Sequence, residues 1–217
     1  MTRIAIIGGH GKVALKLSRL LSDKGHEVAS FIRNPQHSDD VAATGATPSV
    51  FDVEKSTTAE IAAALSGRDA VVWSAGAGGG NPARTYAVDR DAAIRSMDAA
   101  AEAGVGRYVM VSYVGSRKDH GVPPENSFFH YAEAKAAADE YLRGTSLAWT
   151  MLAPGTLTEG PGSGLIEVIE HGAPGSTATS RANVALVAAA VLERPETAGR
   201  TIRFRDGSVP VDEALGN

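Results

Sequence analysis

The stretch RIAIIGGHGKVA, residues 3–14, leads from a short apolar run into a glycine-rich turn. Its β-branched residues predict a buried strand, and apolar residues at helical spacing as far as Leu21 predict a helix that ends at Gly25. A helix that begins at such a turn presents unpaired N–H groups and the positive end of its dipole, which together can bind a diphosphate. The alternative is that the glycines only end the strand. The expected anion contacts are Gly8, His10, Gly11, Lys12 and Val13.

Short apolar strands and helices alternate along the rest of the chain. This alternation predicts an α/β fold with a doubly wound parallel sheet of Rossmann type, in three layers (α/β/α), as one domain over residues 1–217. Thr57 and Glu60 have the spacing of a capping box, which marks the start of one of the helices. The expected strands span residues 3–7, 27–32, 47–53, 69–74, 107–112, 147–152 and 201–204, and the later helices span 88–103, 131–142 and 181–192.

Two long segments rich in Gly, Pro and Ser interrupt the alternation, at residues 113–130 and 154–180. Irregular segments of this length inside a compact domain are usually functional. Both follow expected strands, so they lie at the carboxyl edge of the sheet, where open α/β sheets bind ligands. We therefore expect the substrate there. Tyr113, Phe128 and Phe129 either line an apolar pocket for it or anchor the loop to the core.

The composition excludes several classes of function. The net charge of −4 provides no basic field for nucleic acid or an anionic membrane. The absence of cysteine excludes disulfides, thiolate zinc sites and cysteine nucleophiles, and the six histidines have no metal-ligand spacing. The longest apolar run, residues 184–192, is about half a membrane span. We expect a cytoplasmic protein, a monomer or small homo-oligomer, that acts on a small molecule without a metal.

The residues after the second strand bear on the choice of cofactor. A site for NAD places a carboxylate there for the ribose 2′-hydroxyl, whereas a site for NADP places a cation for the 2′-phosphate. The segment FIRNP, residues 31–35, contains no acid. Its Arg33 has a planar guanidinium that matches a phosphate, although it could also be an ordinary solvated arginine. The sequence therefore favours NADP.

Two further strand ends provide candidate cofactor contacts. Asp52 ends the third strand and either accepts a hydrogen bond from the adenine amino group or caps the helix that follows. The fourth strand ends in the small residues SAGA, 74–77, which allow the backbone to pack against a cofactor. The alternative for this segment is a flexible loop that continues into the three glycines 78–80. The candidate contacts here are Asp52, Val53, Ala75, Gly76 and Ala77.

Tyr131 and Lys135 are four residues apart and therefore adjacent on one helix face. A tyrosine with its reference pKa of about 10 is a poor acid or base at neutral pH. A neighbouring ammonium would lower that pKa and make acid–base catalysis possible. The alternative is an exposed pair on a solvated face. The position of the pair after the fifth strand, at the expected cofactor edge, favours the catalytic interpretation.

With these motifs together, the sequence resembles the atypical short-chain dehydrogenase/reductase superfamily, in particular its small NAD(P)H-binding, epimerase/dehydratase-like members. The resemblance implies hydride transfer from a nicotinamide, with Tyr131 as proton donor and Lys135 holding the ribose and tuning the tyrosine. It also implies that Pro154, Gly155, Thr156 and Leu157 lie along the nicotinamide. The residues that carry the resemblance are 8–11, 33–35, 52–53, 74–77, 131–135, 154–155 and 180–181.

The sequence departs from this family pattern after the fifth strand, where many relatives carry a hydroxyl pair that polarises the substrate carbonyl. This chain has Ser112-Tyr113, so either Ser112 does that work or Tyr113 replaces the usual serine. Ala153 stands where an arginine is common. We expect an NADP(H)-dependent oxidoreductase that reduces a small carbonyl, quinone or flavin-like acceptor. The alternatives are a non-catalytic nucleotide sensor and a sugar-nucleotide epimerase or dehydratase, although only about 65 residues follow Leu152 for a substrate domain.

Overall fold

The computed structural model describes residues 1–216, which form a nine-stranded sheet, a separate two-stranded sheet and eight α-helices. The strands are β1 (Arg3–Ile7), β2 (Glu27–Ile32), β3 (Thr47–Val50), β4 (Ala70–Trp73), β5 (Arg107–Val111), β6 (Trp149–Pro154), β7 (Leu157–Thr158), β8 (Leu165–Val168), β9 (Thr179–Ser180), β10 (Arg200–Asp206) and β11 (Val209–Pro210). The helices are α1 (Lys12–Asp23), α2 (Ser38–Ala42), α3 (Thr58–Leu65), α4 (Pro82–Thr85), α5 (Ala93–Glu102), α6 (Phe129–Arg143), α7 (Arg181–Leu192) and α8 (Val211–Gly216).

Seven parallel strands form the body of the sheet, in the order β3-β2-β1-β4-β5-β6-β10. The chain starts at the centre, adds β2 and β3 on one side, and then crosses to β4 on the other side. In register, Ile6 of β1 lies opposite Ser30 of β2 and Val72 of β4. This reversal of strand order opens a crevice beyond the carboxyl ends of β1 and β4, which is where such sheets bind ligands. The Rossmann-type prediction is confirmed.

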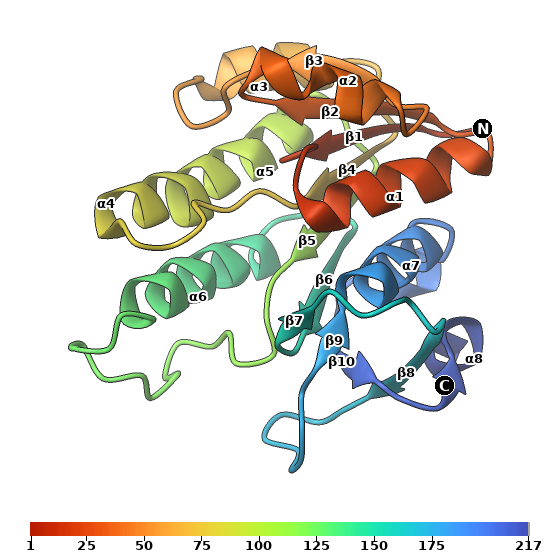
Figure 1. The fold of residues 1–217 in the computed structure, drawn as a ribbon. Helices are drawn as coiled ribbons and strands as arrows, with labels where there is room; N and C mark the ends of the chain where they lie inside the picture. Colours follow the sequence, from red (N-terminus) through yellow and green to blue (C-terminus); the bar gives the residue numbers. More distant parts are fainter. Residues whose placement is uncertain (217) are drawn as a thin grey trace.

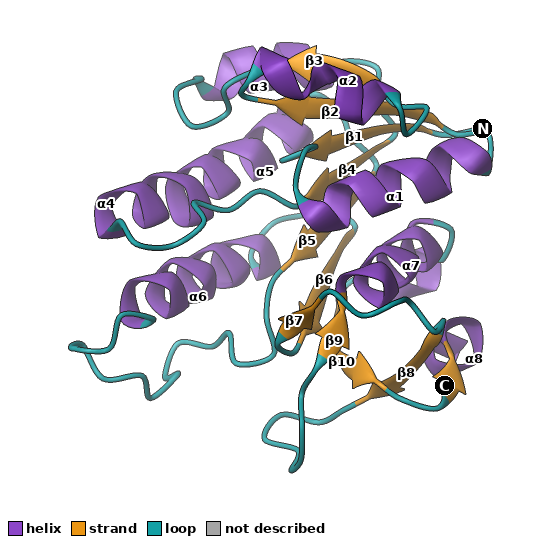
Figure 2. Ribbon diagram, viewed as in Figure 1, coloured by secondary structure: helices purple, strands orange, loops and turns teal. Residues whose placement is uncertain are grey.

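Helices cover both faces of the sheet because side chains alternate along each strand. Ile4 and Ile6 of β1 face a core formed with α1 and α7, while Ala5 and Ile7 face a second core formed with α3, α5 and α6. Figure 1 shows α1 and α7 on one side of the sheet and α5 and α6 on the other. Figure 2 shows the same arrangement as strands between two layers of helix. The three-layer architecture follows.

Local signals explain where the helices begin and end. Gly25 follows α1 with φ +80°, and the capping box at α3 has both of its hydrogen bonds, between Thr57 and Glu60. The helix expected at residues 88–103 begins earlier, at Pro82, where the Asn81 side chain caps α4. A π-helical segment, Tyr86–Ala92, joins α4 to α5. The Asn81-Pro82 pair is a helix start signal that could have located this beginning from the sequence.

The carboxyl-terminal edge of the sheet differs from the sequence-based expectation. Residues 154–180 were expected to be one irregular loop, yet they contain β7, β8 and β9. β8 pairs antiparallel with β10 and β11, so the sheet is mixed rather than purely parallel. These strands are only two to four residues long, and at the edge of a sheet their sequences carry little hydrophobic alternation. Segment 113–130, by contrast, has no regular structure before α6 begins at Phe129.

The longest helix within residues 1–216 is α6, with 15 residues. None of the helices described there has the length and apolar character needed to cross a membrane. That same part of the chain contains no cluster of three or more His, Cys, Asp or Glu side chains that could hold a metal.

Candidate functional site

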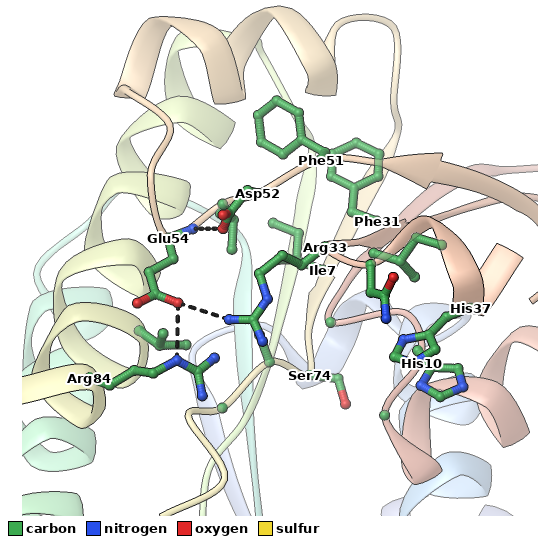
Figure 3. Close-up of a pocket in the computed structure, with 18 residues that line it drawn as sticks. Ile7, His10, Phe31, Arg33, His37, Phe51, Asp52, Glu54, Ser74 and Arg84 are labelled. Atoms are coloured by element: carbon green, nitrogen blue, oxygen red, sulfur yellow. Dashed lines mark hydrogen bonds and ion pairs between the residues drawn. The ribbon is translucent and has the colours of Figure 1, made fainter. Parts of the chain in front are cut away.

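A cavity of about 360 Å³ opens at the carboxyl ends of β1, β2, β3 and β4 (Figure 3). Among its walls are the glycine-rich turn after β1, the start of the β3–α3 connection and the segment after β4. Eight of the expected cofactor contacts line it: Gly8, His10, Gly11, Arg33, Asp52, Val53, Ala75 and Gly76. The lining also includes residues that the sequence analysis did not select, namely Phe31, Asn34, His37, Phe51, Glu54, Ser74, Arg84 and Val88.

The glycine-rich turn brings backbone close to the end of β4. Gly8 has φ +86°, and a Cβ there would stand 2.6 Å from the backbone nitrogen of Ala75. The Gly11 N–H donates to the Gly8 carbonyl at 2.9 Å. Gly11 is also the N-cap of α1, and within residues 1–216 no side chain caps that end. The first N–H groups of α1 are therefore available to an anion, because they have no partner inside the helix.

The side chains around this turn have several different partners. Val13 packs into the core, so only its backbone is available to a ligand. Lys12 Nζ binds Glu159 Oε1 at 2.7 Å, and Arg181 Nη1 binds the same oxygen at 2.9 Å. The His10 ring stacks on His37, with centroids 3.6 Å apart. Lys12 and Val13 do not line the cavity through their side chains.

The opposite end of the cavity combines aromatic and charged groups. The rings of Phe31 and Phe51 lie 5.6 Å apart, and Asp52 lies beside them on the cavity wall. The Asp52 carboxylate accepts a hydrogen bond from the Glu54 N–H at 3.2 Å. It does not cap α3, because Thr57 does so. Of the two interpretations of Asp52, the capping one is wrong.

The segment after β4 is held by a carboxylate that the sequence analysis did not select. Asp89, from the π-helical segment, is only 2% exposed and accepts the Ala77 N–H at 3.0 Å. A Cβ on Gly76 would lie 3.1 Å from Asp89 Oδ1. Burial raises the pKa of Asp89, while the hydrogen bond from Ala77 and the charge of Lys135 oppose that shift. Asp89 therefore ties the chain at Ala77 to the π-helical segment.

Lys135 is buried at the carboxyl end of β5, the strand next to β4. It is 1% exposed, and its Nζ donates to the Val111 carbonyl at 3.0 Å. Tyr131 packs against Tyr113 and Phe128, with ring centroids 5.5 and 5.1 Å away. The alternative of an exposed Tyr–Lys pair is wrong. The pair adjoins the cavity through Asp89, whose carboxylate interacts with both Lys135 and the backbone after β4.

The electrostatics of Tyr131 differ from the sequence-based expectation. Burial raises the pKa of Tyr131 above its ordinary value, and the charges of Asp89 and Asp139 raise it further. The lowering expected from Lys135 is wrong for this structure. Here the ammonium donates to the Val111 carbonyl, and its charge lowers the pKa of Asp89. Tyr131 is therefore a protonated phenol at neutral pH and a weaker acid than an ordinary tyrosine.

Ser112 is hydrogen-bonded to a second buried carboxylate, Asp139. Its Oγ donates to Asp139 Oδ2, and the two residues are 5% and 2% exposed. Asp139 Oδ1 and the Tyr113 hydroxyl are both buried, and neither has a hydrogen-bond partner within residues 1–216. Burial raises the pKa of Tyr113 to about 12. Asp139 is four residues beyond Lys135 on α6, and this helical spacing was the signal that could have identified it.

The segment expected along the nicotinamide has structural roles of its own. Pro154 ends β6, and the Gly155 N–H donates to Thr179 Oγ1 at 3.0 Å. A Cβ on Gly155 would overlap the Thr177 carbonyl oxygen. Thr156 accepts the Thr179 N–H at 2.8 Å through its carbonyl, and Leu157 begins β7. None of these four lines the cavity described above, so their contact with a cofactor stays a prediction.

Comparisons with known proteins place this geometry in a wider context. The sequence profile of the NAD(P)H-binding family matches residues 8–195. A Bacillus subtilis protein, YhfK, which is named as an uncharacterized sugar epimerase, is 31% identical over 215 residues, or 98% of each chain. The matched residues include both the glycine-rich turn and the Tyr131–Lys135 pair.

Solved structures match the whole fold. One from Bacillus halodurans, provisionally named an NAD-dependent epimerase/dehydratase, has a TM-score of 0.92 at 30% identity and covers 100% of this chain and 99% of its own. The oxidoreductase ylbE from Lactococcus lactis has a TM-score of 0.87 at 28% identity, with 99% and 95% of the two chains covered. The structural similarity therefore extends over the whole of the described fold.

Proposed function

The chain belongs to the NAD(P)H-binding family, a Rossmann-type oxidoreductase family, and from this premise we propose that it is an NADP(H)-dependent oxidoreductase. Its acceptor would be a small carbonyl, quinone or flavin-like compound. The observation that carries the proposal is the position of Tyr131 and the buried Lys135 near the carboxyl end of β5, which only β4 separates from β1 and the uncapped start of α1. A dinucleotide bound on α1 could extend along the sheet edge to that pair.

The residues present fit such a cofactor. The backbone at Gly8 leaves no room for a side chain, and the N–H groups at the start of α1 suit a diphosphate. The apolar wall near Phe31 and Val53 suits an adenine ring. Arg33, on the same wall, supports the preference for NADPH because its guanidinium matches a 2′-phosphate. Lys135 would hold the nicotinamide ribose from the end of β5.

A nicotinamide cofactor held by these residues would supply a hydride, that is, two electrons and one hydrogen, to the carbon of the acceptor carbonyl. Tyr131 supplies the matching proton to the acceptor oxygen, so the product is an alcohol. Its raised pKa keeps the phenol protonated, so efficient proton donation at neutral pH requires this pKa to fall when the cofactor and the acceptor bind. The aromatic cluster of Tyr113, Phe128 and Tyr131 gives an acceptor with a flat ring a surface on which to pack. Solvent protons then restore the phenol.

Specific observations also favour two other functions. The Ser112 hydroxyl donates its hydrogen bond to Asp139, so its proton is not available to polarise a substrate carbonyl. This observation favours a non-catalytic nucleotide sensor. The name of the Bacillus subtilis relative suggests a sugar epimerase. An epimerase would interconvert nucleotide sugars without net oxidation of the cofactor. A sensor would bind the cofactor and turn nothing over.

The test combines cofactor titration with an acceptor screen and the substitution Tyr131→Phe. NADPH should bind, and the variant should retain its affinity within about twofold while turnover falls by about 10² to 10⁴. Tyr141→Phe is the matched control, because Tyr141 lies on the same helix but is 41% exposed and bonds Asp98. Unchanged turnover in Tyr131→Phe would remove that residue from the mechanism. Tight binding without oxidation by any acceptor would favour the sensor, and interconversion of a nucleotide sugar would favour the epimerase.

A further inference from the structure

Glu54 lies between two guanidinium groups on the wall of the cavity. Its Oε2 accepts a hydrogen bond from Arg33 Nη1 at 3.2 Å and another from Arg84 Nε at 3.2 Å. Figure 3 shows both interactions, with Arg33 extended across the cavity toward Glu54.

The three residues come from three different connections at the carboxyl edge of the sheet. Arg33 follows β2, Glu54 follows β3, and Arg84 belongs to α4. Arg84 is also anchored to the chain after β4, because its Nη1 donates to the Ala77 carbonyl at 2.7 Å. The side chain of Arg33 is 55% exposed, and Glu54 provides its one ion pair within residues 1–216. Glu54 therefore links the more exposed Arg33 to Arg84, which is also bonded to the backbone.

The charges of this group bear on which ribose the cavity accepts. Two guanidinium groups and one carboxylate leave a net charge of +1. A 2′-phosphate carries nearly two negative charges, so it must share both arginines with Glu54 and is repelled by it. A ribose 2′-hydroxyl is neutral and can donate a hydrogen bond to the same carboxylate. Glu54 therefore opposes the phosphate and accommodates the hydroxyl.

We propose that Glu54 is a specificity-determining residue, which competes with the 2′-phosphate for Arg33 and Arg84 and so weakens the discrimination between NADPH and NADH. The proposal rests on the proposed function only in that a nicotinamide dinucleotide binds in this cavity. Without Glu54, the two arginines would be free to bind a phosphate together. With Glu54 present, the preference for NADPH over NADH is smaller than the two arginines alone would give.

The test measures the dissociation constants of NADPH and NADH for the native chain and for Glu54→Gln, by quenching of protein fluorescence. The substitution keeps the shape of the side chain and removes its charge. The ratio of the NADH to the NADPH constant should rise about tenfold, which corresponds to about 1.4 kcal/mol. Most of the change should appear as tighter NADPH binding, and the dependence of NADPH affinity on salt should steepen because more uncompensated positive charge faces the phosphate.

Glu167→Gln is the matched control, because Glu167 also pairs with an arginine, Arg205, but lies on β8 away from the cavity. The double variant Arg33→Gln, Glu54→Gln should lose most of the gain in NADPH affinity. A second variant, Glu54→Asp, retains the negative charge and should keep the native ratio of the NADH to the NADPH dissociation constant. With two variants at this position, a folding defect in one of them does not decide the outcome.

The two proposals fail in different ways. If neither dinucleotide binds the native chain, the proposed function is wrong. If both bind and Glu54→Gln leaves their ratio unchanged, or changes both affinities equally, Glu54 does not determine specificity and the proposed function stands. A weaker affinity for NADPH in Glu54→Gln would mean that the carboxylate is needed to hold the arginines in place, which also overturns the inference.

Discussion

Gly8 occupies the point where the turn after β1 comes closest to β4, and its substitution tests how far the cavity depends on that approach. Gly8→Ala would place a Cβ 2.6 Å from the Ala75 backbone and force an alanine to adopt φ +86°. The left-handed conformation alone costs about 1–2 kcal/mol. With the steric overlap, we expect the free energy of unfolding to fall by about 3 kcal/mol or more, measured by urea denaturation.

Gly25→Ala separates these two contributions. Gly25 has a similar φ of +80°, but a Cβ there would meet no atom within 4 Å. Its substitution should therefore cost only about 1 kcal/mol, the price of the backbone conformation. An equal loss of unfolding free energy in the two variants would show that the turn lies farther from β4 than in this structure.

Individual site residues could be predicted from the sequence where a local pattern specifies them. The glycine-rich turn and the spacing of Tyr131 and Lys135 are patterns of this kind. Glu54 and Asp89 were not found, because each becomes part of the site only when strand ends far apart in the sequence are brought together. The expected pKa of Tyr131 was wrong for the same reason, since the burial and the carboxylates that determine it come from the tertiary structure.

At the scale of elements, sequence-based prediction succeeded in the interior of the sheet and failed at its edge. β2 and α7 have the bounds that the sequence indicated, because a buried strand and a capped apolar helix each leave a continuous local signal. β8 and β11 were missed. β8 pairs with both β10 and β11, across turns that no local pattern identifies. The two strands are also too short to show a full hydrophobic alternation.

The capping box of α3 gives a prediction at this scale. Thr57 Oγ1 accepts the Glu60 N–H at 3.3 Å, and Glu60 Oε2 accepts the Thr57 N–H at 2.8 Å. Thr57→Ala removes the first of these bonds, so the free energy of unfolding should fall by about 1 kcal/mol in urea denaturation. Thr58→Ala, one residue later in the helix, is the control and should change it by less than about 0.5 kcal/mol. If Thr57→Ala and Thr58→Ala lower the free energy of unfolding by similar amounts, the effect comes from other side-chain contacts and not from the cap.

At the scale of the whole molecule, the site depends on the sheet as one unit. The cavity is built from β1 to β4, whereas Tyr131 and Lys135 lie on α6, which follows β5. A doubly wound parallel sheet could be predicted from the alternation of elements, whereas the alternation does not specify which crossover returns to the centre. A cofactor that reaches from one group of residues to the other binds only when both halves of the sheet are folded together.

Cofactor binding should therefore raise the stability of the entire chain in one transition. At a concentration one hundred times its dissociation constant, NADPH should raise the free energy of unfolding by about 2.7 kcal/mol. For a chain of 217 residues this corresponds to an increase of about 5–10 °C in the melting temperature, measured by calorimetry. Arg33→Gln, at the same NADPH concentration, should show a smaller increase. Arg143→Gln, at the exposed end of α6, is the control and should retain the full one.

The shape of the transition carries as much information as its midpoint. A single calorimetric transition that moves as a whole on addition of NADPH agrees with a site assembled across the central strands. Two transitions, of which NADPH moves only one, would mean that the cavity and the α6 region unfold separately. In that case the dinucleotide would contact the cavity without reaching Lys135, and the proposed transfer of a proton from Tyr131 would lose its structural basis.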